Sequence, residues 1–197
     1  MQMPFEAMSA DADEDLLAAY AAGDAAAARA LTQRLAPRVF AHAARMLGGD
    51  RAEAEDVAQE ALLRLWRAAP GWRRGEAKVT TWLYRVTANL CIDRMRRRRG
   101  GTDLDAVPEP ADESPSAAEG LQQQARAEAL QGALDGLPDR QRQAVILRHI
   151  EGLSNPEIAE IMDIGPRAVE SLVARGKRAL EDALLGRRDE LGYRDDD

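Results

Sequence analysis

The residues that build disulfide frameworks, metal sites and aromatic cores are scarce in this sequence. It has one cysteine, Cys91, and two histidines, His42 and His149, which lie far apart in the chain. An internal disulfide is therefore excluded, and no cluster with metal-ligand spacing is visible. Aromatic residues make up only 4% of the chain, so its cores must consist mainly of Ala, Leu, Val and Ile. We expect no cofactor, no metal site and no catalytic residue.

Long apolar runs are also missing, and no basic segment followed by an apolar one marks a leader. We therefore expect a soluble, cytoplasmic protein that does not insert into membranes. Abundant Ala, Leu and Arg with few β-branched runs favour helix throughout. The predicted fold class is all-α.

The sequence has fewer basic than acidic residues, 27 against 34, but some of the basic residues are clustered. The net charge of −7 by itself argues against a simple nucleic-acid binder. Arg94 and Arg96–Arg99 nevertheless form a basic run, and the following stretch 100–119 has six acids and no Lys or Arg. This asymmetry of sign is more informative than the net charge.

Two small helical domains are expected. We predict a mobile tail at 1–12, a helical domain at 13–99, a flexible acidic linker at 100–115, a second helical domain at 116–185 and a polar tail at 186–197. Helices of the first domain should start near Asp13, near Asp24 with a break or kink at Pro37, after Asp50, and near Val79. Those of the second should start at Ser116, Pro138, Ser154 and Pro166, with capping boxes at Ser116–Glu119 and Ser154–Glu157.

A leucine lies on the polar face of the helix predicted at 50–67. Ala54, Val57, Ala58, Ala61, Leu62, Leu65 and Trp66 form the apolar stripe, and Leu63 falls opposite it, among Asp56, Gln59, Glu60 and Arg67. Leu63 is either a scattered surface leucine or the apolar centre of a small docking surface. The segment Asp50–Trp66, with its core Glu55-Asp56-x-x-Gln59-Glu60, resembles the sigma-factor segment that binds the clamp helices of the largest RNA polymerase subunit. The resemblance implies that Asp56, Gln59, Glu60 and Leu63 face the polymerase.

The helix predicted from Val79 ends in the arginine run. Four consecutive arginines at 96–99 cannot all pair internally, so phosphate contact competes with a solvated helix end. The preceding loop 70–78 combines glycines, basic residues and Trp72, which suits a displaced single strand, although Trp72 could equally belong to the core. The segment Thr81–Arg97 resembles the sigma-factor signature T-W-L-x-R-I-A-x-N-x-x-I-D-x-x-R-R. That resemblance implies recognition and melting of the minus-ten element by Trp72, Arg73, Arg74, Lys78, Arg85, Asn89, Asp93, Arg96 and Arg97.

Residues 154–180 have the pattern of a helix-turn-helix. In the second helix, Val169, Leu172, Val173, Gly176 and Leu180 share one face, and Arg167, Ser171, Ala174, Arg175 and Arg178 lie on or near the other. The alternative is an ordinary helical hairpin with a basic surface. The segments Leu137–Ala159 and Ala168–Leu180 resemble the sigma domain that reads the minus-thirty-five element, and the polar set would contact that DNA. Pro166-Arg167 replaces the Gly-Thr of many relatives and Gly176 replaces a frequent Ala, which puts the base contacts in doubt.

Residues 13–185 as a whole resemble an extracytoplasmic-function sigma factor. The implied partners are core RNA polymerase, through the clamp helices of its largest subunit and the flap of its second-largest subunit, promoter DNA, and an anti-sigma factor. The implied role of the acidic linker is to thread the polymerase cleft. Three alternatives stay open: an ordinary DNA-binding regulator, a nucleic-acid enzyme and a pure adaptor. The enzyme would need a metal cluster, a phosphate loop or a nucleophile with its base, and none is visible.

Overall fold

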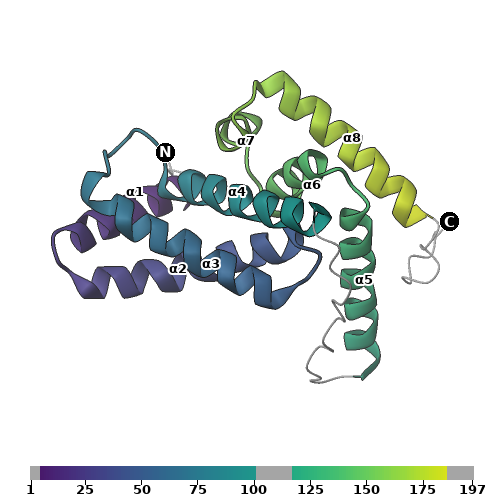
Figure 1. Cartoon of the computed structure of the whole chain (residues 1–197), viewed down its shortest axis with the longest axis horizontal. Coiled ribbons are helices and arrows are strands. Elements are labelled where there is room, and N and C mark those ends of the chain that lie inside the picture. The colour runs from purple at the N-terminus through teal and green to yellow at the C-terminus, as the bar shows by residue number, and fades with distance from the viewer. Residues whose placement is uncertain (1–4, 101–116, 186–197) are drawn as a thin grey trace.

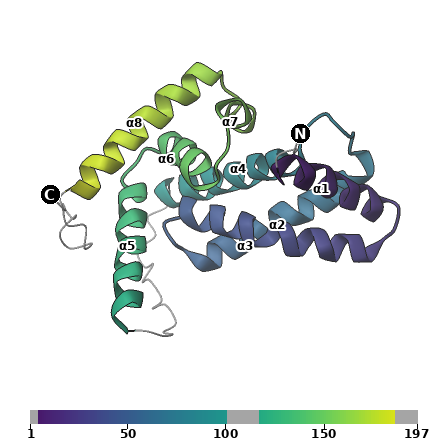
Figure 2. The same cartoon turned by 180° about the vertical axis from the view of Figure 1, so that it is seen from behind.

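The computed structural model describes residues 5–100 and 117–185, and these contain helices but no strands. The first half comprises α1 (Phe5–Ala21), α2 (Ala25–Met46), α3 (Arg51–Ala68), a 3₁₀ turn η1 (Ala69–Gly71) and α4 (Val79–Gly100). The second comprises α5 (Ala117–Asp135), α6 (Asp139–Val145), a π-helical turn η2 (Ile146–Ile150), α7 (Asn155–Met162) and α8 (Pro166–Leu185). Helices α1–α4 form a bundle, and α6 and α7 lie along the side of α4 (Figures 1 and 2).

Helix starts follow from capping residues, as predicted. The Asp24 carboxylate accepts the Ala26 amide at 2.8 Å, and the Asp50 carboxylate accepts the Glu53 amide at 3.0 Å. Both bonds satisfy amides that the first helical turn leaves without partners. At α7, the amide and hydroxyl of Ser154 donate to the Glu157 carboxylate, which confirms that capping box.

Some boundaries differ from the predictions. Helix α1 begins at Phe5 rather than near Asp13, because no glycine or proline interrupts the chain between Pro4 and Gly23. Helix α2 is not broken at Pro37, since the buried residues Leu35 and Val39 hold it against α3 and α4 on both sides of the proline. The predicted linker, the Ser116–Glu119 capping box and the C-terminal tail 186–197 lie outside the described residues.

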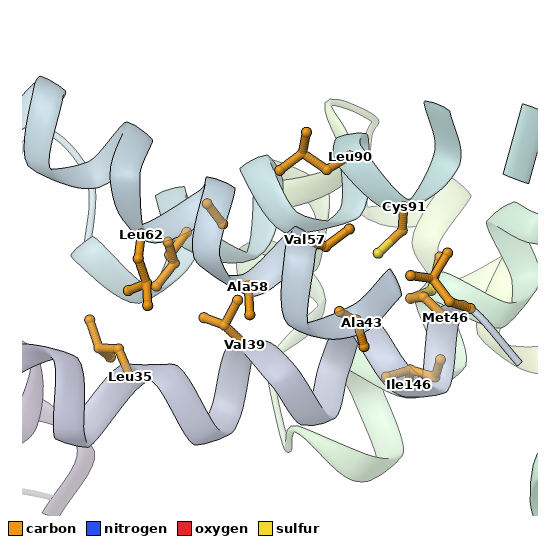
Figure 3. Close-up of a cluster of buried hydrophobic side chains, with 14 of the residues drawn as sticks. Leu35, Val39, Ala43, Met46, Val57, Ala58, Leu62, Leu90, Cys91 and Ile146 are labelled. Carbon is orange, nitrogen blue, oxygen red and sulfur yellow. The ribbon is translucent and has the colours of Figure 1, made fainter. Parts of the chain in front are cut away.

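The core of the bundle extends into the second half of the chain. Small and branched side chains from α2, α3 and α4 interdigitate in it (Figure 3): Leu35, Val39, Ala43, Met46, Val57, Ala58, Leu62, Leu90 and Cys91. Leu134, Leu137, Val145 and Ile146 belong to the same buried cluster. The two predicted domains therefore pack against each other. A second cluster around Leu147, Ile158 and Val169 joins α6, α7 and α8, and it includes Tyr84 of α4.

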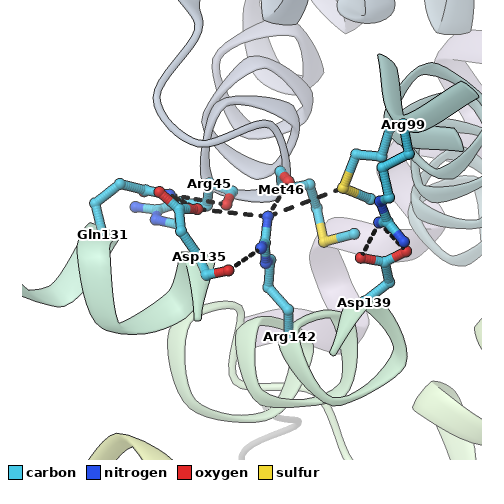
Figure 4. Close-up of polar contacts among 8 residues, drawn as sticks. Arg45, Met46, Arg99, Gln131, Asp135, Asp139 and Arg142 are labelled. Carbon is cyan, nitrogen blue, oxygen red and sulfur yellow. Dashed lines mark hydrogen bonds and ion pairs between the residues drawn. The ribbon is translucent and has the colours of Figure 1, made fainter. Parts of the chain in front are cut away.

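A buried arginine ties the two halves together. Arg142 of α6 is only 8% exposed, and its guanidinium donates to the Met46 carbonyl at 2.8 Å and to the Asp135 carbonyl at 2.7 Å (Figure 4). Met46 ends α2 and Asp135 ends α5, so Arg142 satisfies carbonyls that both helix ends leave open. Each such bond is worth more than a neutral hydrogen bond because the donor is charged.

Gly176 is a packing residue. A Cβ at this position would lie 2.5 Å from Val145 Cγ2 and 3.4 Å from the Gln141 carbonyl oxygen, which is too close for an undisturbed contact. Glycine therefore allows α8 to approach α6 closely. The departure from alanine at this position thus reflects helix packing, and it does not bear on the opposite face of α8, which the sequence predicts to contact DNA.

We predict that Gly176→Ala destabilises the fold. The clash should cost about 1–3 kcal/mol, offset in part by the roughly 1 kcal/mol that alanine gains over glycine in a helix. Thermal unfolding measures this as a lower Tm. The matched control is Gly132→Ala in α5, where an added Cβ meets nothing within 4 Å. That control should keep or raise the Tm, and equal effects of the two changes would contradict the packing account.

Candidate polymerase and nucleic-acid interfaces

Helix α3 presents the exposed polar face that the sequence predicts. Leu63 is 44% exposed, and Asp56 and Gln59 are exposed around it. Glu60 is half-buried and accepts a hydrogen bond from Arg64 at 2.8 Å. The opposite stripe, from Ala54 to Leu65, is buried in the bundle. Leu63 is thus an apolar side chain in contact with water and surrounded by carboxylates and an amide.

The arginine run at the end of α4 is divided between paired and unpaired side chains. Arg98 forms an ion pair with Asp50, and Arg99 pairs with Asp139 through two hydrogen bonds of 2.6 and 2.5 Å. Arg96 and Arg97 are exposed and form no ion pair with any residue in 5–100 or 117–185. The acids that pair with Arg98 and Arg99 are Asp50, at the start of α3, and Asp139, at the start of α6. Both are at least 40 positions away in the sequence, so the residues next to the arginine run do not reveal them. Arg96 and Arg97 are therefore the arginines left available for phosphate.

Part of the predicted minus-ten surface contacts the helix-turn-helix. Arg85 donates to the Glu160 carbonyl of α7, and Lys78 Nζ lies 2.7 Å from Glu157 Oε1. Partial burial would raise the pKa of Glu157, but the hydrogen bonds from Lys78 and Ser154 outweigh it and lower the pKa to about 2. Asn89 and Asp93 are exposed on the same helix.

Of the predicted DNA contacts in the loop before α4, Trp72 and Arg74 are held against the rest of the protein, whereas Arg73 is exposed. Trp72 packs against the core with its ring 5.9 Å from that of Trp82, and its buried ring nitrogen has no hydrogen-bond partner in the described structure. The structure thus favours the core alternative for Trp72. Arg74 pairs with Glu14 and Asp15 of α1. Arg73 is the most exposed cation of the loop, and within the part of the chain that the structure describes it pairs with Glu76 alone, at 3.3 Å.

A buried polar cluster lies where α2, α4 and η2 meet. The hydroxyl of Tyr84 donates to Glu151 Oε2 at 2.6 Å, and Glu151 Oε1 lies 3.5 Å from Arg45 and 3.9 Å from His42 Nδ1. The His42 ring stacks edge-on against Tyr84 at 5.1 Å. Burial, with a smaller contribution from Arg45, lowers the pKa of His42 to about 3, so this side chain is neutral. Sequence analysis missed the cluster because its members are spread over 110 positions, and no local spacing connects them.

The helix-turn-helix has the predicted faces. Ile158, Ala159, Ile161 and Met162 of α7 and Val169 of α8 are buried. The turn between the helices is made by Asp163, whose φ is +52°, followed by Ile164 and Gly165. The five predicted DNA contacts of α8 are all exposed: Arg167, Ser171, Ala174, Arg175 and Arg178. Arg175 also bonds to the Ser171 carbonyl at 3.2 Å, so it lies along the helix surface in this structure.

Comparison with known proteins shows the family. The family model Sigma-70 region 2 matches residues 31–100, and the model Sigma-70, region 4 matches residues 127–180. The ECF (extracytoplasmic-function) RNA polymerase sigma factor SigM of Mycobacterium tuberculosis (strain ATCC 25618 / H37Rv) is 33% identical over 174 residues, which cover 88% of this chain and 85% of SigM. The chain belongs to the ECF sigma factors. It is therefore a non-enzymatic factor for transcription initiation.

Other relatives agree with this assignment. The ECF RNA polymerase sigma factor SigE of Mycolicibacterium smegmatis (strain ATCC 700084 / mc(2)155) is 39% identical over 158 residues and 78% of this chain, and the match spans 60% of the length of SigE. Among solved structures, that of CnrH in complex with the cytosolic domain of CnrY has a TM-score of 0.67 and 26% identity, and the match covers 89% of this sigma factor and 98% of CnrH. This likeness supports the packed arrangement of helices described above.

One further surface of the sigma factor is hollowed. A groove of about 980 Å³ lies between α5, α6 with η2, and α8. Its floor is apolar, with Leu134, Val145 and Leu180, and Leu130 and Leu185 are exposed large apolar side chains in its wall. Arg126, Lys177, Glu181 and Asp182 are charged residues of its lining.

Two kinds of feature are not found in the described residues. No helix there is both long and apolar enough to cross a membrane. Residues 5–100 and 117–185 also hold no group of three or more His, Cys, Asp or Glu side chains placed to bind a metal ion.

We predict that buried His42 makes the stability of the sigma factor depend on pH. The unfolded state takes up a proton near pH 6.5, whereas the folded state takes it up only near pH 3. The contribution of neutral His42 to the free energy of unfolding is therefore fully present above pH 6.5. It is lost as the pH falls from 6.5 toward 3, by up to about 1.4 kcal/mol per pH unit. Thermal unfolding between pH 7.5 and 5.5 measures the slope, and His42→Gln should flatten it. Parallel profiles for the two proteins would contradict the prediction.

Proposed function

We propose that this sigma factor directs core RNA polymerase to promoters through separate surfaces for the enzyme and for two DNA elements. The observation that carries the proposal is the coexistence, in one chain, of the exposed Leu63 among acids and of two arginines, Arg96 and Arg97, that no acid within 5–100 or 117–185 pairs. An ordinary DNA-binding regulator would need the arginines but not the Leu63 surface. A pure adaptor would need the Leu63 surface but not the arginines.

The polymerase would bind the exposed face of α3. Asp56, Gln59, Glu60 and Leu63 form a patch with an apolar centre and polar rim, the usual composition of a small interface. We assign it to the clamp helices of the largest subunit. The apolar groove between α5 and α8 is our candidate for the flap of the second-largest subunit, because its floor accepts an apolar segment and its lining offers both charges.

The minus-ten element would bind along α4 and the loop before it. Arg96 and Arg97 are exposed without ion pairs among the described residues, and they are our principal phosphate contacts. Arg85, Asn89 and Asp93 continue this surface along α4, and Arg73 and Lys78 extend it into the loop. Trp72 is left out of the surface because it packs against the core. Arg74 is left out because α1 already holds it.

The minus-thirty-five element would be read by α8. Ser171 and Ala174 are small and allow the helix to approach the major groove, and Arg167, Arg175 and Arg178 can then reach bases or phosphates. Pro166 begins the helix, a position where its missing amide costs nothing, so the departure at Pro166-Arg167 is compatible with the helix-turn-helix.

Reading both elements would require the two halves of the chain to separate. The element names imply centres about 25 base pairs apart, or roughly 85 Å at about 3.4 Å per base pair. Two packed domains of this size have centres only about 30 Å apart. In the packed arrangement, α7 also bonds to Lys78 and Arg85. We therefore propose that promoter binding on the polymerase exchanges the α4–α7 contact for DNA.

A protein partner would hold the packed form. CnrH was solved with the cytosolic domain of CnrY bound, and we infer that this chain likewise binds a protein partner, an anti-sigma factor. Because polymerase and promoter DNA are in the cytoplasm, we place the protein there.

We predict that Leu63→Asp abolishes binding to core polymerase while the fold stays intact. The change places a charge at the apolar centre of the patch, and Leu63 is 44% exposed and outside the buried stripe of α3. Co-purification with core polymerase and initiation on a genomic template pool are the measurements, with thermal unfolding as the check on folding. Ala18→Asp, at an exposed site of α1, is the control for added charge and should initiate like the wild type. Retained polymerase binding by Leu63→Asp would refute the assignment.

A further inference from the structure

Helix α1 lies outside the residues that the sigma region 2 model matches, which begin at 31. It packs nevertheless against the start of the loop that precedes α4, at η1. Leu17 is fully buried, and Asp13 is buried with its carboxylate 3.1 Å from Arg34. Burial raises the pKa of Asp13, while Arg34 and Arg38 oppose the shift. These contacts fix α1 on the bundle, so residues next to Asp13 have defined positions.

Glu14 connects this fixed helix to the loop. Its side chain is only 11% exposed, and its Oε2 accepts the backbone amide of Gly75 at 3.3 Å. The same oxygen lies 3.8 Å from Nε of Arg74, whose guanidinium also pairs with Asp15. One nearly buried carboxylate thus contacts two successive residues of the loop, 61 positions away in the sequence.

The loop needs such an anchor at this point. Gly75 has a φ of +80°, a left-handed conformation that side chains rarely adopt, and the space around it is open. Within the loop, the Glu76 amide makes only a long bond of 3.4 Å to the Arg73 carbonyl. Trp72 anchors one end of the loop in the core and Val79, fully buried, anchors the other. Between them, the Glu14–Gly75 bond is the contact that ties the backbone of the turn to the bundle in the described structure.

We propose that Glu14 is a positioning residue for promoter opening: it holds the turn at Gly75 so that Arg73 meets the displaced strand. Arg74, which the sequence pattern assigns to DNA, instead pairs with Glu14 and Asp15 of α1. The clasp of this proposal is the Glu14–Gly75 bond alone. The inference rests on the proposed role of the loop in the minus-ten contact. It adds a function for α1, an element that the matched family regions do not include.

The test compares Glu14→Ala, Glu14→Gln, Asp15→Ala and Arg73→Ala as holoenzymes with core polymerase. The template is a promoter chosen from the start sites that the wild-type holoenzyme uses, and permanganate reactivity of the minus-ten thymines measures opening. Glu14→Ala should reduce opening about tenfold, the loss expected for one hydrogen bond to a charged group. Glu14→Gln should stay near wild type, because the amide oxygen still accepts the Gly75 amide. Asp15→Ala, which removes an exposed side chain without touching the backbone of the loop, should also stay near wild type.

Two further readouts separate positioning from general stability. Hydrogen exchange of the Gly75 amide should accelerate in Glu14→Ala and not in Asp15→Ala, while the Tm and core-polymerase binding stay unchanged. If Glu14→Ala opens promoters normally while Arg73→Ala does not, the loop contacts DNA but the clasp is refuted. If neither variant changes opening, the proposed role of the loop fails as well. An equal defect in Glu14→Gln and Glu14→Ala, or a loss of Tm that accompanies it, would also overturn the positioning role.

Discussion

The packing of α7 against α4 is the interaction on which the arrangement of this sigma factor depends. It places Glu157 on Lys78 and the Glu160 carbonyl on Arg85, two side chains assigned to the minus-ten element. A surface ion pair such as Lys78–Glu157 contributes only about 0–1 kcal/mol. Phosphate groups can replace Glu157 beside Lys78, and the Glu160 carbonyl beside Arg85, at little cost. The contacts at the edge of the interface are therefore suited to exchange.

A buried polar centre nearby, where α2, α4 and η2 meet, is incompletely satisfied. Tyr84 bonds to Glu151, but Glu151 Oε1 and both ring nitrogens of His42 have no hydrogen-bond partner among the described residues. Each unsatisfied buried polar group costs about 1–3 kcal/mol, so this centre stabilises the packed form less than an apolar contact would. The continuous apolar core and Arg142 oppose that cost. The apolar core and Arg142 stabilise the packed form, and the unsatisfied polar groups destabilise it. The two halves can therefore stay packed in the free protein and still separate when polymerase and DNA bind.

The sequence predicted local features well and long-range contacts poorly. Asp24, Asp50 and the Ser154–Glu157 box mark helix starts through bonds within three residues, and the faces of α3 and α8 follow from helical periodicity. The exposure of Leu63, Arg96, Arg97 and Arg178 could be predicted for the same reason. The pairing of Arg99 with Asp139, of Arg74 with α1 and of Tyr84 with Glu151 could not, because each depends on how separate helices pack. Trp72 and Gly176 show the same limit: their neighbours, Trp82 and Val145, decide their roles.

The most direct test of the account is a reversible cross-link between α7 and Lys78, the residue just before α4. Lys78→Cys and Glu157→Cys together place two accessible thiols at the contact, whereas the native Cys91 is buried and burial raises its pKa to about 12. The double variant would be joined with a bismaleimide that contains a disulfide, bound to core polymerase, and assayed for promoter opening before and after reduction, beside the two single variants. The account predicts that the cross-linked protein does not open promoters and that reduction restores opening to the level of the unlinked double variant. Equal opening before and after reduction would contradict it.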